Sequence, residues 1–463
     1  MLLSGIGLVL FTALATTASE IKPVTVPLVR NQEGHLSQIR RSVKEKRQVH
    51  KEPLFNAAGR EFLIEVDIGT PAQRFNVTMD TGSATLWVPS TDCSMLKCPY
   101  ERFNASQSST LNQTNTGFQI EYGIGMANGT YAMETVSVGG LTVTGQAVGL
   151  ANETDDILGT FTEGYSNGIM GFGFPSMNAF RGYSQDIPFV FNLVNNNLIP
   201  EPIFSVYLNS AFHYGYSGEV MLGGIDESKY SGQLTYAPVM AYQMTDITGQ
   251  TKSVYIYWTV GGTGIRSSSG YSTNFDQLQG FVLDTGTTLT YVPDQVASDL
   301  VQSITKKDPK SIYDVFNGVY RVDCSLGSQD QNVEFLVATS TQAANNQLNL
   351  TVSLRELIIP IDDAETPEEA NECAFGIAPF PQNSLTGSAV NFILGESVMR
   401  SFYTVHNMGQ QTVGIARAIS SSTGGRSETG DNDNSEGATA SSNLIQSLVI
   451  TTVVIATSIN ILF

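Results

Sequence analysis

The sequence MDTGSATLWVP at residues 79–89 recurs as LDTGTTLTYVP at residues 283–293. Both copies follow an apolar run, place Asp-Thr-Gly before a hydroxyl residue, and end in Val-Pro in the same register. An internal duplication of this kind predicts two related units that pack against each other. We therefore expect the two acids, Asp80 and Asp284, to meet where the two halves of the chain come together.

Each copy is suited to presenting a carboxyl group. The glycine allows a tight turn beside the acid, and the hydroxyl of Ser83 or Thr287 can hydrogen-bond to a carboxylate. Two carboxyl groups held against each other cannot both ionise at low cost, so the pair retains one proton over a broad acidic range. One member can then act as a base while the other acts as an acid.

The doubled motif resembles the active site of pepsin-like aspartic endopeptidases. The similarity covers about residues 60–417, because further landmarks of that family follow in order. Residues 120–125 (IEYGIG) resemble the flap, a hairpin whose tyrosine closes over the substrate, and residues 167–171 and 392–395 resemble the apolar strands beneath each acid. The resemblance implies a mainly β, bilobal fold with the active site in the cleft between two duplicated lobes.

The same resemblance implies the roles of individual residues. Asp80 and Asp284 would activate a water molecule for attack on a peptide bond, with no covalent intermediate and no cofactor or metal. Gly82 and Gly286 would admit the substrate backbone, and Trp87 would stand behind the flap tyrosine. The substrate-binding residues implied are Gly82, Ser83, Tyr122, Gly123, Gly286, Thr287 and Thr288.

Some positions depart from the family pattern. Ile124 stands in the flap where a hydroxyl residue is usual, and Glu396 replaces a commoner Asp after the second apolar strand. Residues 404–407 (TVHN) replace a pattern that usually contains Asp. We expect these departures to affect specificity and tuning more than the chemistry.

The two ends of the chain have compositions unlike the middle. The expected organisation is a signal peptide at 1–18, a basic prosegment at 19–47, an N-terminal catalytic lobe at 48–240, a C-terminal catalytic lobe at 241–417, a Ser/Thr/Gly-rich stalk at 418–443 and a hydrophobic anchor signal at 444–463. Alternating apolar and polar residues over much of the middle predict strands.

The N-terminal 47 residues contain seven Lys or Arg and only three acidic residues, although the whole chain has a net charge of −19. Such a segment could hold an acidic cleft shut by ion pairing, which weakens when carboxylates are protonated. We expect a dibasic-processing protease to cut after Lys46-Arg47. The alternative is a disordered linker with incidental basic residues.

The C-terminal residues 444–463 are uncharged and largely apolar, and no basic residue follows them. A small-residue site, a polar spacer and a terminal apolar tail are typical of a glycolipid (GPI) anchor signal, with Asn434 as a candidate attachment residue. The alternative is a transmembrane tail, which usually has a basic anchor on its cytoplasmic side. The protein resembles fungal yapsins and candidapepsins in this respect. We therefore expect a monomer delivered by the secretory pathway to the plasma membrane or cell wall.

Four cysteines in a secreted chain predict two disulfides, for which three pairings are possible. The family resemblance implies Cys93–Cys98 and Cys324–Cys373. Zinc binding is disfavoured, because the chain has only four histidines and none lies near the cysteines at ligand spacing. The sequons expected to carry glycans are at Asn104, Asn112, Asn128, Asn152 and Asn349.

The acidic composition bears on substrates and on other functions. Aligned with the family, Glu61, Glu65, Glu121 and Thr78 would lie near the non-primed side of the cleft, and acidic subsites would favour polypeptides with basic residues near the cut. The alternative is that these acids are solvated surface charge. Nucleic acid is not an expected partner, because basic residues cluster only in the prosegment.

Two other functions use part of the same pattern. A catalytically silent peptide-binding or adhesive surface module would lose one of the acids or their glycines, and none is lost. A polysaccharide-cleaving enzyme would also use two carboxylates, but these need not lie in duplicated Asp-Thr-Gly loops. The sequence favours the endopeptidase.

Overall fold

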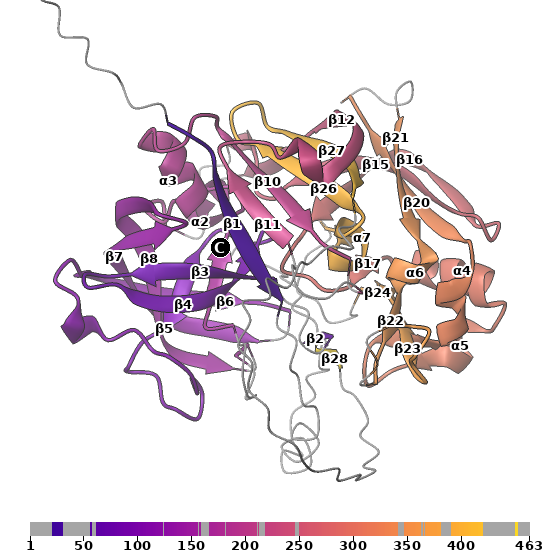
Figure 1. The fold of residues 1–463 in the computed structure, drawn as a ribbon, viewed down its shortest axis with the longest axis horizontal. Helices are drawn as coiled ribbons and strands as arrows, with labels where there is room; N and C mark the ends of the chain where they lie inside the picture. Colours follow the sequence, from indigo (N-terminus) through magenta and orange to yellow (C-terminus); the bar gives the residue numbers. More distant parts are fainter. Residues whose placement is uncertain are drawn as a thin grey trace, which may run out of the picture.

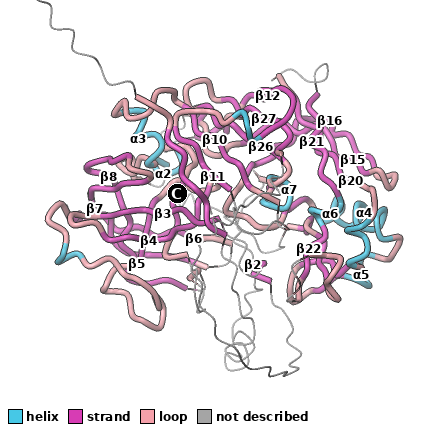
Figure 2. Tube along the Cα trace, viewed as in Figure 1, coloured by secondary structure: helices cyan, strands magenta, loops and turns pink. Residues whose placement is uncertain are grey.

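A computed structural model describes residues 21–30, 56–57, 62–123, 125–155, 157–158, 166–180, 182–210, 212, 218–245, 250–340, 347–362, 364, 366–380, 390–419 and 450–451. Strands dominate and helices are short (Figure 2). The N-terminal and C-terminal parts of the chain form two β-rich halves that lie side by side (Figure 1). The predicted mainly β, bilobal fold is confirmed.

A 13-stranded sheet runs through the N-terminal half and the centre of the molecule. In spatial order its strands are β12 (Tyr230–Pro238), β27 (Thr412–Ala418), β26 (Phe402–Asn407), β10 (Ile203–Leu208), β11 (Gly218–Leu222), β1 (Val24–Arg30), β3 (Phe62–Ile68), β4 (Gln73–Asp80), β9 (Ile169–Gly171), β5 (Leu86–Pro89), β8 (Leu141–Asp155), β7 (Met126–Val138) and β6 (Asn112–Glu121). Because β26 and β27 come late in the sequence, the two halves share this sheet.

The C-terminal half is built on a seven-stranded sheet and a four-stranded sheet. The first has the order β21 (Gln347–Ser353), β20 (Asn332–Ala338), β15 (Thr259–Ser267), β16 (Ser272–Leu283), β25 (Phe392–Leu394), β17 (Thr290–Val292) and β24 (Ile377–Pro379). The second has the order β18 (Tyr313–Asp314), β19 (Val319–Val322), β23 (Cys373–Phe375) and β22 (Ile358–Pro360). Two short pairs complete the strands: β13 (Tyr242–Thr245) with β14 (Thr251–Val254), and β2 (Asn56–Ala57) with β28 (Ile450–Thr451).

The helices are short segments between the strands. They are η1 (Ala105–Gln107), α2 (Ser176–Phe180), α3 (Phe189–Asn195), η2 (Glu227–Lys229), α4 (Asp294–Thr305), α5 (Pro309–Ile312), η3 (Cys324–Ser328), α6 (Leu354–Leu357) and α7 (Glu396–Met399). The longest of them, α4, buries Leu300, Val301 and Ile304 on one face and ends at Lys306 in the left-handed conformation. No helix among the described residues is long and apolar enough to span a membrane.

The sequence duplication is visible in the strand pairing. In the N-terminal half β9 runs parallel to β4 and antiparallel to β5, and β5 runs parallel to β8. In the C-terminal half β25 runs parallel to β16 and antiparallel to β17, and β17 runs parallel to β24. Asp80 is the last residue of β4, and Asp284 directly follows β16. Each acid therefore leaves an equivalent strand in an equivalent small sheet.

Glycines allow the chain to cross closely beneath each acid. A Cβ on Gly171, at the end of β9, would lie 2.5 Å from the backbone of Ala84, and a Cβ on Gly395 would lie 2.1 Å from the carbonyl oxygen of Leu289. Both distances are too short for any side chain. The glycine that ends β9 and the glycine that follows β25 are therefore required by packing against the two acid loops.

Residues 24–30, which the sequence assigns to the prosegment, form strand β1 inside the large sheet. This strand pairs with β11 on one side and with β3 on the other, and it buries Val26 and Leu28. Part of the segment expected over the cleft is thus a structural strand. Residues 31–47, the predicted signal peptide at 1–18 and the predicted stalk from residue 420 lie outside the described residues.

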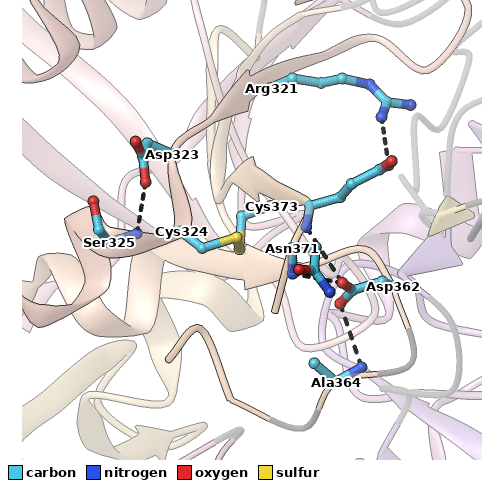
Figure 3. The surroundings of a disulfide bond; sticks show 9 residues. Arg321, Asp323, Cys324, Ser325, Asp362, Ala364, Asn371 and Cys373 are labelled. Carbon is cyan, nitrogen blue, oxygen red and sulfur yellow. Dashed lines mark hydrogen bonds and ion pairs between the residues drawn. A yellow bond between two sulfur atoms is a disulfide. The ribbon is translucent and has the colours of Figure 1, made fainter. Parts of the chain in front are cut away.

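Both disulfides implied by the family resemblance are present. Cys93 and Cys98 close a short loop after β5, and Cys324 and Cys373 join η3 to β23 in the C-terminal half. Around the second bond, the Asp362 carboxylate accepts hydrogen bonds from the backbone N–H groups of Asn371 and Ala364 (Figure 3). The bond therefore ties η3 to β23, an inner strand of the four-stranded sheet.

Candidate active site

The two acids have matching hydrogen-bond partners. Asp80 accepts from the N–H of Gly82 at Oδ1 (2.8 Å) and from the hydroxyl of Ser83 at Oδ2. Asp284 accepts from the N–H of Gly286 at Oδ1 (2.9 Å) and from the hydroxyl of Thr287 at Oδ2 (2.6 Å). Each loop therefore orients both oxygens of its own carboxyl group.

The threonines between these residues join the two loops. The Thr81 N–H donates to Thr285 Oγ1 at 3.1 Å, and the Thr285 N–H donates to Thr81 Oγ1 at 3.0 Å. Each hydroxyl donates in turn to a main-chain oxygen of the other half, Thr81 to Leu283 and Thr285 to Met79, both at 2.8 Å. These four buried bonds fix the relative position of the two acids.

Gly82 permits the close approach of the carboxyl groups. A Cβ on this residue would lie 2.6 Å from Cγ of Asp284 and 2.6 Å from its Oδ2. The sequence predicts that Gly82 admits the substrate backbone, and the structure adds that the Asp284 carboxyl group fills the space where a Cβ of Gly82 would lie. Any larger residue would push the two acids apart.

Burial raises the pKa of both acids. Asp80 and Asp284 have 0% and 1% of their surface exposed. Burial first, and the Asp284 carboxylate second, raise the pKa of Asp80 well above its usual value, whereas the hydrogen bonds from Ser83 and Gly82 oppose the shift. Burial also raises the pKa of Asp284, against the hydrogen bonds from Thr287 and Gly286. The pair therefore retains a proton at pH values where an ordinary carboxyl group would already have lost it.

The β6–β7 hairpin brings Tyr122 against the first half of the site. The Tyr122 N–H donates to the Gly125 carbonyl at 2.7 Å across the turn that contains Gly123. Its hydroxyl accepts a hydrogen bond from Nε1 of Trp87 at 2.7 Å, and Trp87 is fully buried on β5. Trp87 thus lies behind Tyr122, and this bond ties the hairpin to the strand that follows the first acid loop. Ile124 lies outside the described residues.

Two other residues predicted to lie near the substrate, Thr288 and Thr78, are buried. Thr288 is buried, and its carbonyl accepts a hydrogen bond from the N–H of Ser397 at 3.0 Å. Thr78 is also buried and donates to Ser166 at 2.7 Å. Neither side chain is exposed to a ligand in this structure.

The predicted acidic subsite residues differ from one another. Glu65 is exposed and forms an ion pair with Arg74 at 3.5 Å, which neutralises part of its charge. Glu121 is half-buried at the end of β6, beside Tyr122. Glu61 lies outside the described residues. Glu121 is therefore the acid of this set that lies nearest in the chain to the hairpin turn.

The expected glycosylation sites fall into two groups. Asn112, Asn152 and Asn349 are exposed. Asn104 and Asn128 are half-buried and already hydrogen-bonded: the Asn104 Oδ1 accepts from the Ser106 N–H at 3.1 Å, and the Asn128 amide donates to Glu153 at 3.3 Å. Asn434 lies outside the described residues. Within the described residues, no group of three or more His, Cys, Asp or Glu side chains is arranged to hold a metal ion.

The sequence predicts no role for two polar residues that the structure buries, Asp186 and His406. The Asp186 carboxylate accepts hydrogen bonds from Thr85 and Tyr131, which lie 101 and 55 residues away in the chain. His406 is fully buried between Phe204 and Trp258. The unusual segment 404–407 gave a signal for His406, whereas no local pattern marked Asp186.

Comparison with known proteins gives the same answer as the geometry. Residues 61–418 match the family model described as eukaryotic aspartyl protease. Vacuolar protease A of Neurospora crassa is 32% identical over 372 residues, which cover 80% of this chain and 81% of the relative. Cathepsin E of Mus musculus is 33% identical over 373 residues (80% and 83%), and mucorpepsin of Rhizomucor pusillus is 29% identical over 367 residues (77% and 78%).

The chain therefore belongs to the pepsin-like eukaryotic aspartyl protease family. It is an aspartic-type endopeptidase, a hydrolase whose substrates are polypeptides.

Proposed function

We propose that Asp80 and Asp284 form the catalytic dyad of this endopeptidase. The observation that carries the assignment is that the two buried carboxyl groups meet across Gly82, each oriented by a glycine N–H and a hydroxyl of its own loop. The ionised member takes a proton from a water molecule as that water attacks the peptide carbonyl carbon. The protonated member donates a hydrogen bond to the carbonyl oxygen, where negative charge develops.

Two features of the site prepare the dyad for this mechanism: its protonation state and its orientation. The elevated pKa values keep one proton on the pair, which the mechanism requires. The hydrogen bonds from Ser83 and Thr287 reach the Oδ2 atoms and leave the dyad oriented before substrate binds. Tyr122 would close over a bound peptide, order it in an extended conformation and exclude water.

The proposal extends to the maturation and location of the enzyme. It is synthesised with a signal peptide and a prosegment, is cut after Arg47, and is held at the cell surface by a glycolipid attached near Asn434. The basic composition of residues 19–47 and the uncharged tail at 444–463 support this. Glu121 would favour basic residues near the cut, because it is half-buried beside the flap tyrosine.

Peptide cleavage by the expressed protein tests the dyad. Residues 19–434 would be incubated with a mixed peptide library from pH 3 to 7, with and without a statine-type transition-state inhibitor. Cleavage should be acid-dependent, blocked by the inhibitor, lost in Asp80→Asn, and retained in Asp299→Asn, which alters an exposed acid on α4. Correctly processed, folded protein that cleaves nothing would favour a silent peptide-binding module instead.

Two further measurements test the finer proposals. A phosphatidylinositol-specific phospholipase should release the full-length protein from cells, and deletion of residues 444–463 should send it into the medium. A transmembrane tail predicts no release by the phospholipase.

The peptide library tests the role of Glu121 in specificity. That role would be excluded if the cleavage sites of the wild type show no enrichment for Lys or Arg and do not change in Glu121→Gln.

A further inference from the structure

A buried hydrogen-bond network lies at the base of the flap, apart from the contacts described for the dyad. The Thr85 hydroxyl donates to Oδ2 of Asp186 at 2.6 Å, and the Tyr131 hydroxyl donates to the same oxygen at 2.9 Å. The side-chain amide of Asn178 donates to the Asp186 main-chain oxygen at 3.1 Å. Thr85, Asn178, Asp186 and Tyr131 are 1%, 1%, 2% and 5% exposed, so all four residues are shielded from water.

The network joins three separate segments of the N-terminal half. Thr85 immediately precedes β5 and lies two residues after Ser83 of the dyad loop. Tyr131 is on β7, the second strand of the flap hairpin. Asp186 lies between α2 and α3. One carboxylate oxygen therefore links the loop that carries Asp80 to the hairpin that carries Tyr122.

Aromatic contacts extend this link along the flap. The Tyr131 ring lies 5.3 Å, centroid to centroid, from Phe118 on β6 and 5.0 Å from Tyr183. Phe118, Ile120 and Tyr122 alternate along the hairpin and are buried in one apolar cluster with Trp87. A shift of the Tyr131 ring would therefore be passed to the face of β6 that leads to Tyr122.

The flap is thus joined to β5 and the loop before it at two points. The Trp87–Tyr122 hydrogen bond holds the hairpin near its tip, and the Thr85–Asp186–Tyr131 bonds hold it near its base. Burial and the Asp186 carboxylate raise the pKa of Tyr131, so its hydroxyl keeps the proton that it donates to Asp186. Loss of the acceptor would leave two buried hydroxyl groups without this partner.

We propose that Asp186 is a positioning residue of the endopeptidase, whose carboxylate fixes the base of the flap hairpin against the dyad loop and thereby sets the affinity for extended peptides. Asp186 acts through Thr85 and Tyr131. The inference rests on the proposed roles of the dyad and of Tyr122.

Tyr131→Phe tests the link with little change in volume, because it removes one donor and keeps the ring. Tyr403→Phe is the matched control: its hydroxyl donates to Ser205 at 2.7 Å in the large sheet, between β26 and β10. We expect Tyr131→Phe to raise KM for an extended peptide about fivefold with kcat within about twofold, and Tyr403→Phe to leave KM unchanged. Both variants should lose similar thermal stability, so a purely structural effect would not separate them.

Asp186→Asn provides a second perturbation, because a neutral amide oxygen accepts weaker hydrogen bonds than a carboxylate, and an amide nitrogen in the place of Oδ2 accepts none. We expect KM to rise about tenfold. Adding Tyr131→Phe to Asp186→Asn should cause little further loss, since both changes remove the same bond. If Asp186→Asn does not fold, the comparison of Tyr131→Phe with Tyr403→Phe still decides.

Hydrogen exchange gives a readout that does not depend on activity. Backbone amides of β6 and β7 should exchange faster in Tyr131→Phe than in the wild type, while those of β15 and β20 should not change. Flap exchange and KM that match the wild type in both Tyr131→Phe and Asp186→Asn would overturn the proposal. A wild-type protein that cleaves no peptide would refute the proposed function, and the exchange data would still show whether Asp186 fixes the flap.

Discussion

Replacement of His406 by phenylalanine should stabilise this protein, and more at acidic than at neutral pH. His406 is fully buried on β26, stacked on Phe204 with ring centroids 4.5 Å apart, and 4.9 Å from Trp258. Neither ring nitrogen has a hydrogen-bond partner among the described residues. Phenylalanine would preserve the stacking and remove two unsatisfied polar atoms.

The pH dependence follows from the direction of the pKa shift. Burial lowers the pKa of His406 from 6.5 to about 3. Protons therefore bind the unfolded imidazole more tightly than the folded one, and the folded state loses stability as pH falls through 6.5 towards 3. Between pH 7.5 and pH 4 this residue should reduce the free energy of unfolding by about 3 kcal/mol. His406→Phe abolishes that loss.

Urea unfolding at pH 7.5 and pH 4 measures the effect. Wild type and His406→Phe would be compared in an Asp80→Asn background, which prevents self-digestion. The stability difference between the two proteins should grow by about 3 kcal/mol on acidification. A difference that is the same at both pH values would show that the folded imidazole is protonated at pH 4, and would refute the reasoning.

Three other predictions concern parts of the fold already described. Gly82→Ala should lower kcat/KM at least about a hundredfold in the peptide assay, because its Cβ would lie 2.6 Å from Cγ of Asp284 and displace that acid. Loss of the long-range disulfide through Cys324→Ser with Cys373→Ser should lower the free energy of unfolding by about 4 kcal/mol in urea, since the bond spans 49 residues. Deletion of residues 19–30 should reduce the yield of refolded enzyme, measured by titration with a statine-type inhibitor. A synthetic peptide of residues 21–30 should restore that yield. An unchanged yield after the deletion would show that β1 is dispensable.

Much of the fold followed from local sequence signals. The repeated Asp-Thr-Gly loops and the alternating strands predicted two β-rich halves with related acids between them, because such patterns depend on residues close together in the chain. The hydroxyls of Ser83 and Thr287 were predicted to support the carboxyl groups for the same reason. The structure adds their distances and their matching partners.

Contacts between distant segments were not predictable in the same way. The sequence gives no reason why Asp186, among many acids, accepts hydrogen bonds from Thr85 and Tyr131. It also gives no sign that the Asp284 carboxyl group fills the space where a Cβ of Gly82 would lie. The pairing of β1 with β11 and β3 depends on sheet edges formed by residues far along the chain.

The crossed hydrogen bonds of Thr81 and Thr285 have a consequence for how the two halves can move. Because each bond runs from one half to the other beside the acids, a rotation of the halves about that point would leave the spacing of the two carboxyl groups unchanged. Such a rotation would separate the outer parts of the two halves, and so admit a long chain or release its fragments. The width of the entrance would then change while the geometry of the two catalytic carboxyl groups stays the same.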